Sequence, residues 1–209
     1  YDIPGFHLPK FYHPDPSVKR KSGFLQPEIN NSNVLGSSFT MPYFKVISDN
    51  KDLTVTPILF DTDTHMSSIE YRQKNKYSSL SLDFAGVNNY ESFTTKKRNT
   101  LSHFFAKFDL DLNLENFQTS NLNMFIKKAS KETYLSVFEQ YITKNKSLRP
   151  ANFSQLENKI VLDLDHENFT FDGGLIAYDN LGVEKKSDRY QYVLPYYSFN
   201  KDISQNYFN

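Results

Sequence analysis

The 209-residue chain contains no cysteine, which excludes disulfide frameworks, thiolate metal sites and cysteine nucleophiles. Long apolar runs are also missing, since none approaches the roughly 18 to 20 residues of a membrane-spanning helix. Transmembrane β-strands need only about 9 to 11 residues of alternating polarity, so the missing apolar runs do not exclude a membrane protein built from strands. Charge of one sign is not in excess, because 24 Lys and Arg balance 24 Asp and Glu. Nucleic-acid binding is therefore not expected.

Aromatic residues are abundant, with 19 Phe and 14 Tyr. Such enrichment favours strands, whereas alanine is scarce and helix-type runs are confined to a segment near residues 131–146. Apolar residues recur with a period of two almost throughout the chain. In residues 100–115, even-numbered residues from Phe104 to Leu114 form an apolar face, and only Leu101 and Phe105 interrupt the polar one. Composition and period together predict an all-β fold.

Short polar connectors separate the alternating runs, at residues 48–51, 61–64 and 75–76. Their length and composition are typical of hairpin turns, so we expect an antiparallel meander of roughly eight to ten strands. Polar stretches at 87–99 and 178–188 are expected to be loops. A short helix is plausible within 130–148, where Tyr134, Val137, Phe138 and Tyr141 share a helical face. Periodicity alone does not separate a membrane barrel from a soluble sandwich, which is the commoner fold.

The sequence predicts no catalytic site, no metal site and no cofactor. The histidines are scattered without a helical pair, and the acidic residues around Asp163 are better explained as a polar strand face than as metal ligands. No nucleophile motif and no phosphate-binding loop is present. We therefore do not expect an enzyme.

Ordered sequence blocks between residues 3 and 72 carry a more specific signal. They are Pro4–Phe11, Arg20–Pro27, Pro42–Phe44, Asp52–Pro57 and Ile69–Arg72. In content and spacing they resemble the LptD family of outer-membrane lipopolysaccharide-assembly proteins, also called organic solvent tolerance proteins or OstA. Beyond residue 90 the resemblance is limited to alternating strands and loops, where family context would make part of 130–148 strand.

The resemblance implies an architecture and a function. Residues 1–14 would end a periplasmic β-jellyroll, and residues 15–209 would be the opening strands of an incomplete barrel of about 26 strands. Both ends of the chain are expected to be truncated. The parent would transport lipopolysaccharide into the outer leaflet of the bacterial outer membrane, with an LptE-like lipoprotein and LptA-like or LptC-like jellyroll proteins as partners. The isolated piece would have to curl, form a homo-oligomer or repack.

The resemblance also singles out residues. Pro27 and Pro42 would weaken the first two barrel strands beside a lateral gate, and Gly23 would let the chain bend as it leaves the jellyroll. The alternative is that both prolines merely end strands or form turns.

A second group of residues would contact lipopolysaccharide directly. Lys19, Arg20 and Lys21 would meet its phosphates, although a solvated basic turn explains them equally well. Phe6, Leu8 and Phe11 would line the acyl-chain groove of the jellyroll, unless they are ordinary core. The rival function from another class is a soluble β-sandwich or small barrel that binds a lipid or glycan.

Overall fold

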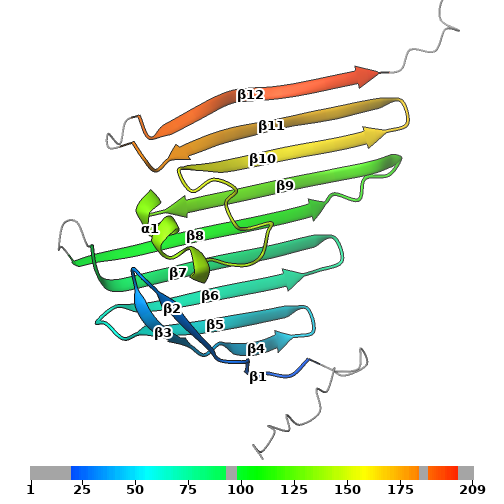
Figure 1. The fold of residues 1–209 in the computed structure, drawn as a ribbon. Helices are drawn as coiled ribbons and strands as arrows, with labels where there is room; N and C mark the ends of the chain where they lie inside the picture. Colours follow the sequence, from blue (N-terminus) through cyan, green and yellow to red (C-terminus); the bar gives the residue numbers. More distant parts are fainter. Residues whose placement is uncertain (1–19, 93–97, 184–187, 202–209) are drawn as a thin grey trace, which may run out of the picture.

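The structure, a computed structural model, describes residues 20–92, 98–183 and 188–201, and they form one antiparallel β-sheet. The sheet has 12 strands in the order β1-β4-β5-β6-β7-β8-β9-β10-β11-β12, with β2 and β3 paired beside this path (Figure 1). The strands are β1 Gly23–Phe24, β2 Glu28–Ser32, β3 Gly36–Thr40, β4 Tyr43–Ser48, β5 Lys51–Phe60, β6 His65–Lys74, β7 Ser78–Glu91, β8 Arg98–Asp111, β9 Phe117–Ala129, β10 Gln155–His166, β11 Phe169–Asn180 and β12 Tyr190–Lys201.

The predicted all-β antiparallel meander is confirmed, and the sheet is open and curled. From β4 onward each strand pairs with the next one in sequence. Within the described residues, no second sheet packs on this one, and β12 does not pair back to β1. The described chain is therefore neither the sandwich nor the closed small barrel that the rival interpretation required.

Connections at the two ends of the strands differ in length. The turns β4–β5, β6–β7, β8–β9 and β10–β11 are short and share one end, at the right of Figure 1. The connections at the other end include the long segment between β9 and β10. The three predicted hairpin connectors are confirmed. The predicted loops were too long, because β7 continues to Glu91, β8 begins at Arg98 and β11 continues to Asn180.

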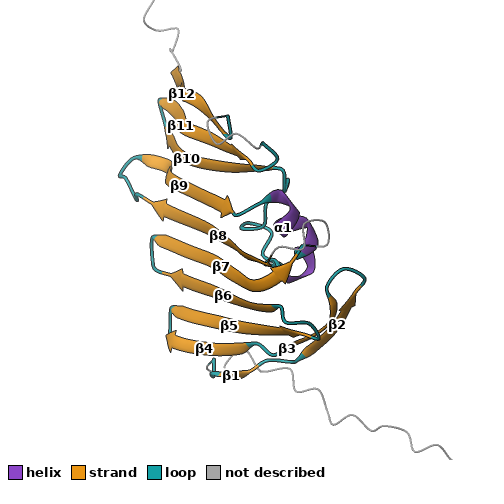
Figure 2. Ribbon diagram, turned by 90° about the vertical axis from the view of Figure 1, so that its left-hand side faces the viewer, coloured by secondary structure: helices purple, strands orange, loops and turns teal. Residues whose placement is uncertain are grey.

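The segment between β9 and β10, residues 130–154, which we call the insertion, contains the helix α1, Glu132–Val137, and the 3₁₀ turn η1, Glu139–Tyr141. The helical alternative for this segment is thus confirmed. The insertion lies on one face of the sheet, which we call the inner face (Figure 2). Leu101 and Phe105 belong to the core beneath it, which explains why they interrupt an otherwise polar face. The core contains Leu35, Ile58, Phe60, Met66, Ala85, Val87, Leu101, Phe105, Ala129, Tyr134, Leu135, Phe138, Ile142, Leu148 and Leu156.

The two faces of the sheet differ in chemistry along rows of cross-strand partners. One outer-face row is apolar over six strands, through Phe24, Tyr43, Val55, Ile69, Phe84 and Phe104, and it continues to Lys128 on β9. An inner-face row is mostly charged or polar and consists of Asp52, Arg72, Ser81, Lys107, Phe125 and Lys159. Large apolar side chains of the outer face remain exposed, such as Phe84 at 46%. In the described parts of the chain, no helix is long and apolar enough to cross a membrane.

Candidate functional site at the proline-interrupted edge and the inner face

The first two passes of the chain through the sheet are each broken in the middle. The first consists of β1 and β2 with residues 25–27 between them, and the second of β3 and β4 with residues 41–42 between them. Pro27 immediately precedes β2, and Pro42 immediately precedes β4. Each break splits one pass into two strands, so the sheet has 12 strands where fewer were expected.

Prolines remove hydrogen bonds at this break. The N–H of Leu25 donates to the carbonyl of Pro42 at 2.8 Å, and the N–H of Met41 donates to the carbonyl of Pro57 at 3.4 Å. Opposed residues of an antiparallel ladder can exchange two bonds, but proline has no N–H to donate in return. The pairs Leu25–Pro42 and Met41–Pro57 therefore each keep at most one of the two possible ladder hydrogen bonds. Sequence reasoning missed Pro57, although the equal spacing of Pro27, Pro42 and Pro57 was visible.

The pairing of the first two passes also changes register at the break. Phe24 pairs with Tyr43 on one side of it, and Glu28 pairs with Thr40 on the other. Three residues of the first pass thus face two residues of the second, which is the count of a β-bulge.

Beyond the break, the β2–β3 hairpin bends toward the side of the sheet that carries the insertion (Figure 2). The hydroxyls of Ser38 and Tyr141 hydrogen-bond at 2.7 Å, and the Lys144 ammonium lies 3.6 Å from the Glu28 carboxylate. Gly36 closes the hairpin with φ of +73°, and a Cβ there would lie 2.2 Å from a carboxylate oxygen of Asp61. A side chain at Gly36 would therefore be strained and would also clash.

The predicted basic cluster is only partly described. The Arg20 guanidinium lies 2.5 Å from the Asp52 carboxylate and also donates to the Asp49 carbonyl, while Arg72 contacts the other Asp52 oxygen at 2.8 Å. Asp52 is buried, so Arg20 fastens the start of the described chain to β5. Lys21 is exposed. The structure thus gives Arg20 a partner within the protein.

Four other predicted residues lie outside the described ones: Lys19 of the basic cluster, and Phe6, Leu8 and Phe11 of the proposed acyl-chain groove. Gly23 pairs with Phe44, and a Cβ at Gly23 would meet nothing within 4 Å. The predicted bend at Gly23 concerns the preceding segment and stays a prediction.

A buried polar network joins the insertion to the centre of the sheet. His103 Nε2 lies 2.8 Å from an Asp83 carboxylate oxygen, and His103 Nδ1 lies 2.8 Å from the Tyr134 hydroxyl. All three residues are at most 2% exposed. Burial, and secondarily the nearby Asp83 carboxylate, raises the pKa of the Tyr134 hydroxyl. Sequence reasoning gave His103 no role, although its place between Leu101 and Phe105 signalled a covered part of the polar face.

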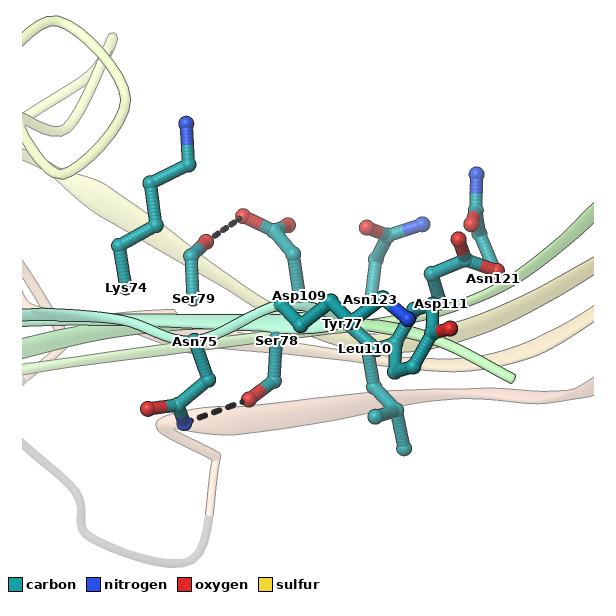
Figure 3. A pocket seen from close by; sticks show the side chains of 11 residues that line it. Lys74, Asn75, Tyr77, Ser78, Ser79, Asp109, Leu110, Asp111, Asn121 and Asn123 are labelled. Carbon is teal, nitrogen blue, oxygen red and sulfur yellow. Dashed lines mark hydrogen bonds between the residues drawn. The ribbon is translucent and has the colours of Figure 1, made fainter. Parts of the chain in front are cut away.

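The inner face is strongly polar near the short turns. In Figure 3, Lys74, Ser79, Asp109, Asn123 and Asn121 lie on one side of the sheet, whereas Leu110 points to the other. The Ser79 hydroxyl donates to Asp109 at 3.0 Å. These side chains border a shallow depression of about 240 Å³. Among the described residues, no group of three or more His, Cys, Asp or Glu side chains could hold a metal ion.

An open all-β sheet with an apolar outer face and a polar inner face is the class that the geometry defines. No family model matches the chain. It is similar to the LPS-assembly protein LptD of Idiomarina loihiensis, with 24% identity over 170 residues, covering 81% of this chain and 21% of that protein. The LptD of Psychrobacter cryohalolentis is 37% identical over 71 residues, covering 34% of this chain and 7% of that protein.

The LptD of Francisella tularensis subsp. novicida is 28% identical over 138 residues, covering 60% of this chain and 16% of that protein. The chain thus spans about a fifth or less of the length of these relatives. The comparisons support an LptD-like family at modest identity.

Proposed function

We propose that this chain is part of an LptD-like protein of the bacterial outer membrane that assembles lipopolysaccharide there. The observation that carries the proposal is the division of cross-strand rows into an apolar outer face and a polar inner face. An outer-membrane barrel needs this division, because its strands face lipid on one side and a wet interior on the other. The similarity to LptD proteins selects lipopolysaccharide from the possible cargoes.

The lengths of the connections support an orientation in the membrane. Outer-membrane barrels have short periplasmic turns and longer extracellular loops. The turns after β4, β6, β8 and β10 are short, and the first described residues lie near the first of these, where Arg20 contacts Asp49. In this proposal residues 1–14 end a periplasmic jellyroll and residues 15–209 begin the barrel. The insertion then lies toward the outside of the cell.

The proline-interrupted edge would form one side of a lateral opening. Missing ladder bonds at Pro42 and Pro57, together with the bulge at residues 25–27, weaken the pairing there and lower the cost of separating strands. Lipopolysaccharide would leave through this opening, and LptE-like, LptA-like or LptC-like proteins would be partners of the complete protein. The proposal involves no catalytic step.

The test replaces Pro27 and Pro42 by valine in the complete gene product. Valine can donate a ladder bond, and each new backbone bond should strengthen the edge by about 0.5–1.5 kcal/mol. We expect lipopolysaccharide to reach the surface of intact cells more slowly, measured with a surface-restricted antibody after pulse labelling.

Pro195→Val is the matched control, because Pro195 lies in β12, far from this edge in the sheet order. It should leave delivery unchanged. Normal delivery in the double variant would contradict the role of the edge. Depletion of the whole protein tests the broader function, since unchanged surface lipopolysaccharide after depletion would contradict a role in its assembly.

A further inference from the structure

A depression of about 460 Å³ lies on the inner face beside the turn that joins β4 and β5. Its wall includes Arg20 from the start of the described chain, Asp52 from β5, Arg72 and Lys74 from β6, and Ser81 from β7. The volume falls within the roughly 300–1,000 Å³ of pockets that bind small molecules. The depression is therefore large enough for a small ligand or for the head of a larger one.

Positive charge exceeds negative charge in this wall. The wall contains three cations, Arg20, Arg72 and Lys74, and two carboxylates, Asp49 and Asp52. The Asp52 side chain is only 6% exposed, whereas the two arginine side chains bound to it are 47% and 48% exposed. The shared carboxylate thus lies beneath the surface and the guanidinium groups lie at it. An anion is the ligand that this arrangement favours.

Arg72 retains hydrogen-bond donors for a ligand. Its Nε donates to an Asp52 oxygen at 2.8 Å. A guanidinium carries further N–H donors on its two Nη groups, which form a planar fork. Among the described residues, none accepts a hydrogen bond from the Nη groups of Arg72. The contact with Asp52 therefore orients the guanidinium and leaves the end of the fork for a second acceptor.

Lys74 and Ser81 place two further donors in the wall. Lys74 lies two residues after Arg72 in β6, so both side chains are on the inner face, about 7 Å apart along the strand. Figure 3 shows the Lys74 side chain extending from this face with its ammonium away from the sheet. Ser81 is the cross-strand partner of Arg72. Guanidinium, ammonium and hydroxyl donors thus border one depression.

We propose that this depression binds a phosphate group, with the Arg72 fork as a bidentate donor and with Arg20 and Lys74 as further cationic contacts. Guanidinium groups bind phosphate oxygens through two parallel hydrogen bonds, and an ammonium adds a compact charge. Asp52 is a positioning residue, because it holds both guanidinium groups. Arg72 and Lys74 lie outside the basic cluster that the sequence predicted. As a contact for transported lipopolysaccharide, the site rests on the function proposed above.

The experiment uses the full chain in micelles of a detergent with an uncharged headgroup. Inorganic phosphate is the probe, and its binding is followed by phosphorus NMR. Arg72→Gln removes the fork but leaves Asp52 its contact with Arg20, so the fold should be retained. Phosphate binding should weaken about tenfold or more, because charge-assisted hydrogen bonds are lost. Lys128→Gln is the matched control, since it removes one exposed positive charge from the outer face of β9, and it should bind phosphate like the parent.

Arg72→Lys is the second variant and separates binding from folding. A lysine ammonium keeps the charge and can pair with Asp52, but it cannot hold a phosphate at two points. Phosphate binding should weaken about threefold, while the denaturant midpoint of unfolding stays that of the parent. No saturable phosphate binding in the parent, or equal affinity in Arg72→Gln and Lys128→Gln, overturns the proposal. Parent-like affinity in Arg72→Lys would contradict the bidentate role.

Purified lipopolysaccharide identifies the source of the phosphate, which is either a lipid headgroup or a soluble phosphomonoester. If lipopolysaccharide displaces inorganic phosphate and its enzymatically dephosphorylated form does not, the site takes the headgroup. Phosphate binding that neither form affects supports a soluble phosphomonoester. Phosphate binding that fails while depletion of the complete protein still lowers surface lipopolysaccharide refutes this inference alone. Binding that persists although depletion has no effect refutes only the proposed function.

Discussion

The two faces of β7 and β8 show how one alternating pattern serves two environments. On the outer face, Phe84 and Phe104 are cross-strand partners and are 46% and 37% exposed. On the inner face, Asp83 and His103 are buried beneath the insertion. At these two pairs polarity and burial are inverted relative to a soluble protein, because the apolar side chains are exposed and the polar ones are covered, although apolar residues such as Phe105 are also buried beneath the insertion. Such an inversion is stable where the outer face meets lipid.

Removing one partner of the buried network should have the largest effect. Asp83→Ala leaves His103 buried without its acceptor, and breaking a buried pair in this way costs about 3–5 kcal/mol. We expect this loss in the free energy of unfolding, measured with denaturant in detergent micelles. Asp109→Ala removes a partly exposed inner-face carboxylate and should cost less than about 1 kcal/mol. Equal losses in the two variants would show that the inner face is uniformly solvated.

A charge on the outer face tests the other half of the comparison. Phe84→Arg should destabilise the protein in lipid vesicles by about 2–4 kcal/mol if Phe84 lies near the bilayer centre. Thr54→Arg introduces the same charge on the inner face opposite Glu70 and should change stability by less than about 0.5 kcal/mol. The measurement is urea unfolding in vesicles. Similar values for both variants would mean that the outer face does not contact lipid.

The Tyr134 hydroxyl gives the smallest effect and a pH dependence. Tyr134→Phe leaves His103 Nδ1 without a partner and should cost about 1–3 kcal/mol at neutral pH. Because burial raises the pKa of Tyr134 above its ordinary value of 10.0, the folded chain keeps a proton that the unfolded chain releases. The contribution of the Tyr134 hydroxyl to the free energy of unfolding is therefore fully present below pH 10.0 and decreases as the pH rises above it.

Measuring the free energy of unfolding between about pH 8 and 11 checks this dependence, because this range includes the ordinary tyrosine pKa of about 10. The decrease should be smaller in Tyr134→Phe than in the parent. The matched control is Tyr77→Phe, which changes an exposed tyrosine and should keep the decrease of the parent. A parent and Tyr134→Phe that lose stability equally over this range would contradict the buried role of the hydroxyl.

The sequence was sufficient for the features that depend on local pattern. Alternation predicted the strands and the face on which Phe104 lies, and the helical spacing of Tyr134 and Phe138 predicted α1. It was not sufficient for features that depend on distant pairing. His103 meets partners 20 and 31 residues away, and no local pattern gives that register. Loop boundaries were wrong for a related reason, because pairing between β7 and β8 extends strands into polar sequence.

The prolines combine features that the sequence could predict with features that depend on distant pairing. Pro27 and Pro42 were recognised from the family resemblance, and the structure places both in short breaks directly before strands, while their role beside a lateral gate stays a prediction. Their alignment with Pro57 and the bend of the hairpin toward the insertion required the register and the fold.

Substitutions and deletions act differently on the register change at the edge. Residues 25–27 outnumber the two residues opposite them, so the mismatch is a matter of chain length rather than of side-chain identity. Any substitution, including both proline replacements, preserves that count. Only an insertion or deletion alters it, and deleting one of these three residues would give the first two passes a common register. The register mismatch is therefore robust to point mutations, unlike the missing ladder bonds at the prolines, and it is vulnerable to the loss of a single codon.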